Sequence, residues 1–265
     1  MQFLSSIPLV VTSALVIFSP LQEGGTTHVA QMIIRFLILA WAGGALALSI
    51  RQGRLTIPLL SVRYFVLVFL GFAVIATMFS PYAHPSRQWL FTIICYATLF
   101  YLLVSFVDRW EHVHTLTIVV VLMGVGEAAL TILQGLVWND MRPSGTFFNP
   151  NFLAGYLAVS WAILLSAAVY GYRRTAALHW LPISPTLWWF GVGASLGSLF
   201  LAVLLTQSRG GMIVVLVATV FIVMARYGWK VAGSCLVLLM VGGLLIPTPL
   251  RERVQAEHQQ NPVSY

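Results

Sequence analysis

Two short polar stretches interrupt a very apolar chain and contain the residues best suited to chemistry. The first is residues 142–151, RPSGTFFNPN, and the second is residues 206–211, TQSRGG. Each contributes one arginine, whose planar guanidinium matches phosphate oxygens in a bidentate manner, and glycines let backbone amides approach the same anion. We therefore predict that Arg142 and Arg209 are the catalytic cations of an anion site. The further substrate-binding residues predicted there are Ser144, Asn149, Asn151, Ser208 and Gly210.

The surrounding chain has the composition of a helical membrane protein. Of its 265 residues, 59% are hydrophobic and 8% are charged, against about 25% charged in an ordinary soluble domain. The apolar residues form runs of roughly 18 to 23, the length that crosses a hydrocarbon core as a helix. The expected fold class is an all-α polytopic bundle with about nine spans. Their predicted bounds are 3–19, 29–50, 59–80, 90–107, 115–137, 151–170, 188–206, 212–225 and 231–246.

The placement of basic residues predicts the orientation of these spans, because cytoplasmic loops carry an excess of lysine and arginine. One set of loops and span ends holds eight basic residues, namely Arg51, Arg54, Arg63, Arg109, Arg173, Arg174, Arg226 and Lys230. The opposite set holds five, namely Arg87, Arg142, Arg209, Arg251 and Arg253. We therefore place the N-terminus in the cytoplasm and both polar stretches on the opposite face of the membrane.

Both polar stretches also have structural interpretations. Arg209 lies in a turn so tight that its charge falls at or just below the membrane interface, where charge is costly unless paired. Its alternative role is an anchor to lipid headgroups. In the first stretch, Asn149 is a good N-cap and Pro150 suits a first helical position, so both can simply start a helix. These local roles leave Arg142 unexplained, and we favour substrate binding for it.

Glu127 is a carboxylate inside the fifth predicted span, and Gln134 follows seven residues later on the same helix face. An ionised acid within the membrane needs a partner. Arg35, in the second span, is the base predicted at comparable depth. We expect Glu127 and Arg35 to form a structural pair, or Glu127 to be neutral; a proton relay through Glu127 is the alternative.

Cysteine and histidine show no metal-ligand pattern. Cys95 and Cys235 each lie in an apolar run, which is typical of small core residues. The six histidines lack ligand spacing with one another or with carboxylates. We therefore expect no metal site and no cofactor.

Together these motifs resemble the core of the O-antigen ligase and polymerase superfamily. The resemblance rests on RPSGTF at 142–147 with NPN at 149–151, followed one span later by TQSRG at 206–210, and Gln134 also fits. It covers roughly residues 115–225. Members of this superfamily are bacterial inner-membrane glycosyltransferases that act on the periplasmic side. The resemblance thus implies half of a GT-C-like membrane glycosyltransferase.

What the resemblance implies is transfer of a glycan from an undecaprenyl-pyrophosphate donor to an acceptor hydroxyl. In a ligase of lipopolysaccharide biosynthesis the acceptor is lipid A-core. In an O-antigen polymerase it is another lipid-linked repeat, and in a protein O-oligosaccharyltransferase it is a serine. Arg209 and Arg142 would hold the diphosphate without a metal, and Ser208 would add a hydrogen bond.

The chain departs from the family at its C-terminal end. The family carries a longer periplasmic segment, with a further arginine and a histidine that acts on the acceptor hydroxyl. We expect a transmembrane domain over 1–246 and the start of that segment over 247–265, where His258 lacks the pattern around the family's base. We therefore expect this chain to be a truncated piece that does not turn over alone.

Two other functional classes fit the same composition. A transporter of an amphipathic anion would use the arginines to line its pathway, and would show inverted repeats and helices broken near the midplane. Neither feature is evident in the sequence, so glycan transfer is the leading hypothesis. A non-catalytic membrane subunit is the third alternative.

Overall fold

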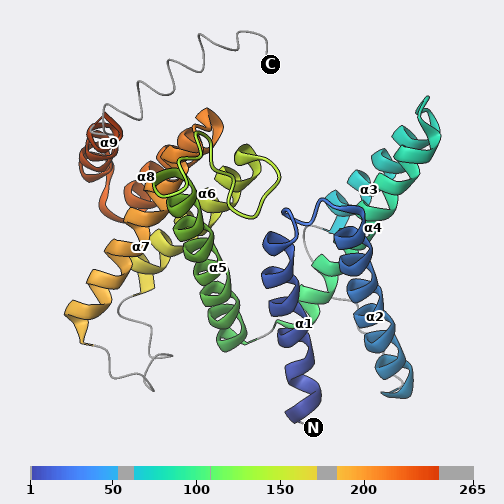
Figure 1. The fold of residues 1–265 in the computed structure, drawn as a ribbon. Helices are drawn as coiled ribbons and strands as arrows, with labels where there is room; N and C mark the ends of the chain where they lie inside the picture. Colours follow the sequence, from blue (N-terminus) through green and yellow to red (C-terminus); the bar gives the residue numbers. More distant parts are fainter. Residues whose placement is uncertain (1, 53–62, 108, 172–183, 245–265) are drawn as a thin grey trace. The chain divides into compact units, whose positions relative to one another are not determined.

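A computed structural model describes residues 2–52, 63–107, 109–171 and 184–244 of the chain (Figure 1). These segments form nine α-helices and no β-strand, so the predicted all-α class is confirmed for them. A π-helical turn, η1 (Ala167–Gly171), continues the sixth helix. The helices are α1 (Gln2–Leu21), α2 (His28–Gln52), α3 (Arg63–Met78), α4 (Ala83–Phe106), α5 (Trp110–Leu136), α6 (Pro150–Ser166), α7 (Pro185–Leu205), α8 (Arg209–Tyr227) and α9 (Trp229–Leu244). The segment predicted over 247–265 lies outside the described residues.

Six of the helices are long and apolar enough to cross a membrane, namely α2, α4, α5, α6 with its π-helical turn, α7 and α8. The apolar stretches of α1, α3 and α9 are shorter. The chain is therefore a multi-pass membrane protein, and the remaining three crossings stay a prediction. Helix α8 is longer than the span predicted over 212–225, because it begins at Arg209 and includes both glycines.

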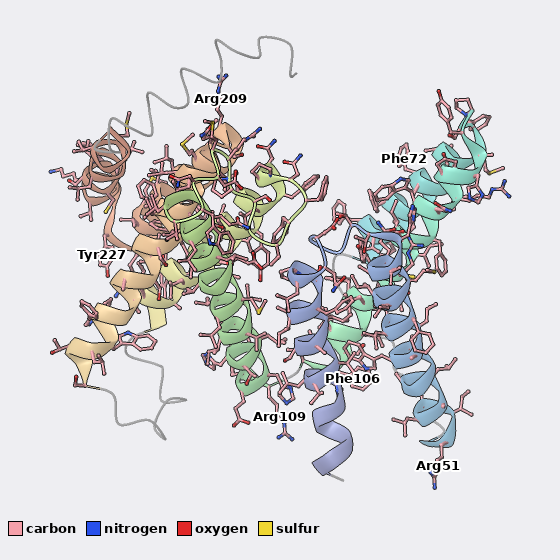
Figure 2. The ribbon with its side chains drawn as sticks, in the orientation of Figure 1. Arg51, Phe72, Phe106, Arg109, Arg209 and Tyr227 are labelled. Carbon is pink, nitrogen blue, oxygen red and sulfur yellow. The ribbon has the colours of Figure 1, made fainter. Side chains whose placement is uncertain are left out.

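The first compact unit, Met1–Leu116, is built around α4. This helix packs against α1, α2 and α3, and α1 also packs against α2. Its apolar core consists of Leu15, Ile34, Ile38 and Cys95. Most large side chains of α3 point outward instead, as Phe72 does in Figure 2. Such exposure is normal for a membrane helix, because lipid tails are as apolar as leucine.

The second compact unit, Thr117–Tyr265, is organised around α6. Helix α6 packs against α7 and α8, and α8 packs against α9. The fully buried side chains at its centre include Leu153, Leu157, Leu199, Val203 and Val215. All the predicted site residues belong to this unit, which begins close to the start of the core predicted over 115–225. The described chain thus has two compact units within the single transmembrane domain that we predicted.

Two glycines let the helices of the second unit approach closely. A Cβ atom added to Gly124 of α5 would lie 2.5 Å from the Cβ of Ser160 in α6. A Cβ added to Gly211 of α8 would lie 2.6 Å from the Cβ of Ala154 in α6. Both separations are too short for real side chains. The α5–α6 and α6–α8 contacts therefore depend on glycine at these two positions.

We expect Gly211→Ala to lower the free energy of unfolding of the protein, because the added methyl group forces α6 and α8 apart. Overpacking of this kind costs about 1–3 kcal/mol, which exceeds the gain of about 1 kcal/mol from replacing a helical glycine by alanine. Gly155→Ala is the matched control, since its Cβ meets nothing within 4 Å. Unfolding in mixed micelles with increasing SDS measures both values, and equal stability of the two variants would contradict the close contact.

Candidate functional site

The loop between α5 and α6 folds back into the end of the second unit. Its residue Thr146 contacts the side chain of Glu127 on α5. Glu127 lies nine residues before Leu136, the last residue of α5, and this corresponds to about 14 Å along the helix. Helical side chains point toward the N-terminus, away from the end that the loop enters. The loop thus returns along α5 toward the middle of the helix, and its non-helical backbone must be enclosed by protein wherever lipid surrounds the helices.

Two polar side chains of α5 hold this loop in place. Glu127 is only 3% exposed, and its carboxylate accepts hydrogen bonds from the Thr146 hydroxyl at 2.6 Å and from the Thr146 amide at 3.0 Å. Gln134 accepts a bond from the Gly145 amide at 2.7 Å and donates one to the Gly145 carbonyl at 2.8 Å. Buried backbone groups must be paired, and α5 supplies partners at these positions.

The loop fits only with glycine at position 145. Gly145 has φ +61°, a left-handed conformation that favours glycine. A Cβ atom there would also lie 2.5 Å from Oε2 of Glu127. On either side of it, Pro143 and Phe147 are buried, and the Phe147 ring packs on Tyr156 with centroids 5.5 Å apart. The loop is therefore a packed part of the helix bundle.

These contacts give Glu127 partners within its own unit, and its predicted pairing with Arg35, a residue of the first unit, stays a prediction. Both oxygens of the Glu127 carboxylate are engaged by Thr146. The Arg35 guanidinium donates to Gln31 at 2.9 Å and to Thr92 at 2.6 Å, within the first unit. The prediction assumed straight helices joined by loops outside the membrane. The loop between α5 and α6 instead brings the hydrogen-bond donors of Thr146 to the acid.

Arg142 connects the loop to the turn between α7 and α8. Its Nε donates to the carbonyl of Thr206 at 3.2 Å, and one terminal nitrogen donates to Oδ1 of Asn151 at 3.0 Å. The Gln207 side chain adds a second link by donating to the Met141 carbonyl at 2.8 Å. The two polar stretches therefore meet at one end of the second unit. Arg142 is exposed, and within the described segments three of its five N–H groups remain for a ligand.

The polar residues at the two helix starts act mainly as caps. Asn149 caps α6, as predicted, by accepting from the Asn151 amide at 2.8 Å. Ser208 caps α8 by accepting from the Gly211 amide at 3.3 Å, and it is only 5% exposed. The hydroxyl that we predicted to contact the substrate thus accepts a capping bond, and its O–H remains a donor. The signal was in the sequence, because serine before a helix is a typical N-cap.

The other predicted residues differ in how accessible they are. Arg209 is the first residue of α8 and is exposed, and its side chain has no hydrogen-bond or ion-pair partner within the described segments. Figure 2 shows it projecting from the end of α8 opposite Tyr227. Gly210 is exposed in open space. Ser144 is partly buried, and its carbonyl accepts from the Phe147 amide at 3.0 Å.

Two helix N-termini lie side by side at this end of the unit. Gly211 and Ala154, which are in contact range, both lie near the first turns of α8 and α6. Each N-terminus carries a positive partial charge, and the first amides of a helix have no acceptor within the helix. With Arg142 and Arg209, this end of the unit is electropositive and suited to an anion. In the part of the chain that the structure describes, no group of three or more His, Cys, Asp or Glu residues could hold a metal ion.

Comparison with protein-family models, with curated proteins and with solved structures gave no match to the chain. The functional assignment therefore depends on the residues and their geometry.

We expect Glu127→Gln to loosen the loop, because the amide group of glutamine offers one acceptor in place of two and turns a donor toward Thr146. Hydrogen bonds to charged groups contribute about 1.5–3 kcal/mol, so amide exchange in peptides covering 142–148 should accelerate roughly 30-fold. Hydrogen–deuterium exchange with mass spectrometry measures this. Glu111→Gln, at an exposed position in the first turn of the same helix, is the control. Unchanged protection in Glu127→Gln would show that the carboxylate does not hold the loop.

Proposed function

We propose that this chain is a bacterial inner-membrane glycan ligase of the O-antigen ligase type. The reaction of this type is transfer of a glycan from undecaprenyl pyrophosphate to an acceptor hydroxyl, with lipid A-core as the leading acceptor, and the chain supplies the donor site. The observation that supports this most is the junction of the two polar stretches. Hydrogen bonds from Arg142 to Thr206 and from Gln207 to Met141 join them at one end of the unit, with Arg209 exposed beside them.

The proposed chemistry uses this end of the unit as a cradle for the donor diphosphate. The acceptor oxygen attacks C1 of the sugar, and the bond from C1 to the diphosphate oxygen breaks. The electron pair leaves with the undecaprenyl diphosphate, and the acceptor's hydroxyl proton passes to a base. Guanidinium groups and helix N-termini that face the diphosphate stabilise the charge that develops on it. Arg209 and Arg142 take this role, and the Arg209 and Gly210 amides assist.

The remaining parts of the proposal concern placement in the membrane. All nine helices cross the bilayer, the N-terminus is cytoplasmic, and the arginine-bearing end faces the periplasm. The family resemblance assigns the base to a histidine in a periplasmic segment, and residues 247–265 lie outside the described part of the chain. An O-antigen polymerase and a protein O-oligosaccharyltransferase would use the same donor site with different acceptors.

We expect Arg209→Ala to weaken the binding of undecaprenyl pyrophosphate to the purified protein roughly 10- to 100-fold, as expected for the loss of charged hydrogen bonds. Arg209→Lys should also bind less tightly than wild type, because a point charge lacks the guanidinium fork. Native mass spectrometry of the protein titrated with the lipid measures these affinities. The control is Arg226→Ala, at the other end of α8, where the guanidinium lies 5.5 Å from the Tyr227 ring. Equal affinities of Arg209→Ala and wild type would refute the donor site.

A second pair of variants tests whether Arg142 acts through its charge or only by holding the loop in place. Arg142→Gln removes the cation, whereas Gln207→Ala removes only the neighbouring link to the Met141 carbonyl. We expect Arg142→Gln to weaken lipid diphosphate binding by about 10-fold or more and Gln207→Ala by about 3-fold or less. Equal losses in the same titration would mean that Arg142 acts only by holding the turn.

Transfer and transport are distinguished by the fate of the bond between sugar and diphosphate. In proteoliposomes loaded with a lipid-linked glycan and an acceptor, a transferase releases undecaprenyl pyrophosphate and a transporter moves the donor intact. Mass spectrometry of the extracted lipids identifies which product forms. Movement of the intact donor that requires Arg209 would favour the transporter.

A further inference from the structure

A polar stripe lies between α2 and α4 in the first unit, whereas the proposed donor site belongs to the second unit. The two helices pack against each other, and the Arg35 guanidinium of α2 donates to the Thr92 hydroxyl of α4 at 2.6 Å. Arg35 and Thr92 therefore mark the sides of α2 and α4 that face each other. Residues three, four or seven positions apart in the sequence share a helix face. The polar stripe consists of His28, Gln31 and Arg35 on α2 and His84, Gln88 and Thr92 on α4.

Hydrogen bonds run along both sides of the polar stripe. On α2, Arg35 donates to the Gln31 side chain at 2.9 Å, and Gln31 donates to the Thr26 carbonyl at 3.1 Å. On α4, Thr92 donates to the Gln88 carbonyl at 2.9 Å, while the Gln88 amide nitrogen lies 2.9 Å from Nε2 of His84. Thr92 is buried, whereas Gln88 and His84 are exposed. The stripe thus leads from the helix ends to Arg35.

Arg35 is held firmly but has no anionic partner within the described part of its unit. Its hydrogen bonds go to the neutral side chains of Gln31 and Thr92, and its guanidinium carbon lies 5.6 Å from the centre of the Phe91 ring. Its Nε is buried and makes no hydrogen bond to any described residue. A cation among apolar helices is costly unless it is balanced. These neutral partners fix the orientation of the guanidinium but do not neutralise its charge, so the charge can still pair with an anion.

The guanidinium lies within reach of a lipid headgroup. Arg35 follows His28, the first residue of α2, by seven residues, or about 10 Å along the helix. Its side chain points back toward the N-terminus and bonds to Gln31, one turn closer to the helix end. Long basic side chains reach the interface in this way. The charge therefore lies near the boundary between acyl chains and headgroups.

We propose that the polar stripe binds the phosphate of a membrane lipid, with Arg35 as the cation that pairs with it. The other terminal nitrogen of Arg35, Nη1, keeps two N–H donors for phosphate oxygens, since Nη2 serves Gln31 and Thr92 and Nε is buried. The exposed histidines and Gln88 line the approach from the helix ends. This inference does not rest on glycan transfer, because it concerns only residues of the first unit. The same chemistry would accept a phospholipid, a phosphorylated glycolipid or free phosphate.

The test is a lipid titration of the delipidated full chain followed by native mass spectrometry. Its four arms are phosphatidylglycerol, bisphosphorylated lipid A, a galactolipid without phosphate, and inorganic phosphate. We expect Arg35→Gln to weaken binding of at least one phosphate-bearing lipid about 10-fold or more and to leave galactolipid binding unchanged. Arg51→Gln, at an exposed position in the last turn of α2, is the matched control and should bind like wild type.

A second variant covers the case in which Arg35→Gln does not fold. Thr92→Val keeps the charge but removes the bond that orients the guanidinium, and we expect it to weaken the same lipid about 3- to 10-fold. Equal phosphate-lipid binding by wild type and the folded variants would overturn the proposal. So would an equal loss of galactolipid, or a response to inorganic phosphate alone, which would show that no lipid is recognised. A stronger response to lipid A than to phosphatidylglycerol would identify the glycolipid as the source.

Discussion

The second unit depends on the pair of hydrogen bonds that the buried carboxylate of Glu127 accepts from Thr146. A loop that enters the unit to this depth exposes backbone groups where water is scarce, and each unpaired group there is costly. The carboxylate and the side chain of Gln134 satisfy the chain at Gly145 and Thr146. Because Gly145 and Thr146 are fixed, the following residues run from this point to the start of α6 at Pro150. Arg142 is thereby held against the turn that precedes α8.

The same constraint explains why small residues recur around the site. Gly145 must be glycine because its conformation and the nearby carboxylate exclude a side chain. Gly211 must be small because α8 starts against Ala154 of α6. These two contacts bring the loop and both helix N-termini to one end of the unit. Gly145 and Gly211 thus act through packing. Among the glycines of the two polar stretches, only Gly210 is exposed.

The fold could be predicted from the sequence to a large extent, because apolar runs of spanning length and cap residues are local signals. The start of α6 at Asn149 and Pro150 is an example. The predicted proximity of Arg142 to the second stretch also holds. The partner of Glu127 could not be found, since hydropathy predicts helices and places every loop outside the membrane. Ser208 caps α8, a role that the sequence did not separate from ligand contact because both use the same residue type.

Three arginines near helix ends, Arg142, Arg209 and Arg35, differ in how far protein partners hold their guanidinium groups. Arg142 shares its guanidinium between the Thr206 carbonyl and Asn151, so it fixes the turn and still presents donors. Arg209 has no protein partner in the described segments, so under the proposed function its full charge is available to the leaving diphosphate. Arg35 is oriented by neutral side chains, which preserves its charge without letting it move. A held cation suits a permanently bound headgroup, because its fixed orientation lowers the entropy cost of binding. A free one suits a diphosphate whose charge increases during reaction, because it can follow the departing oxygen.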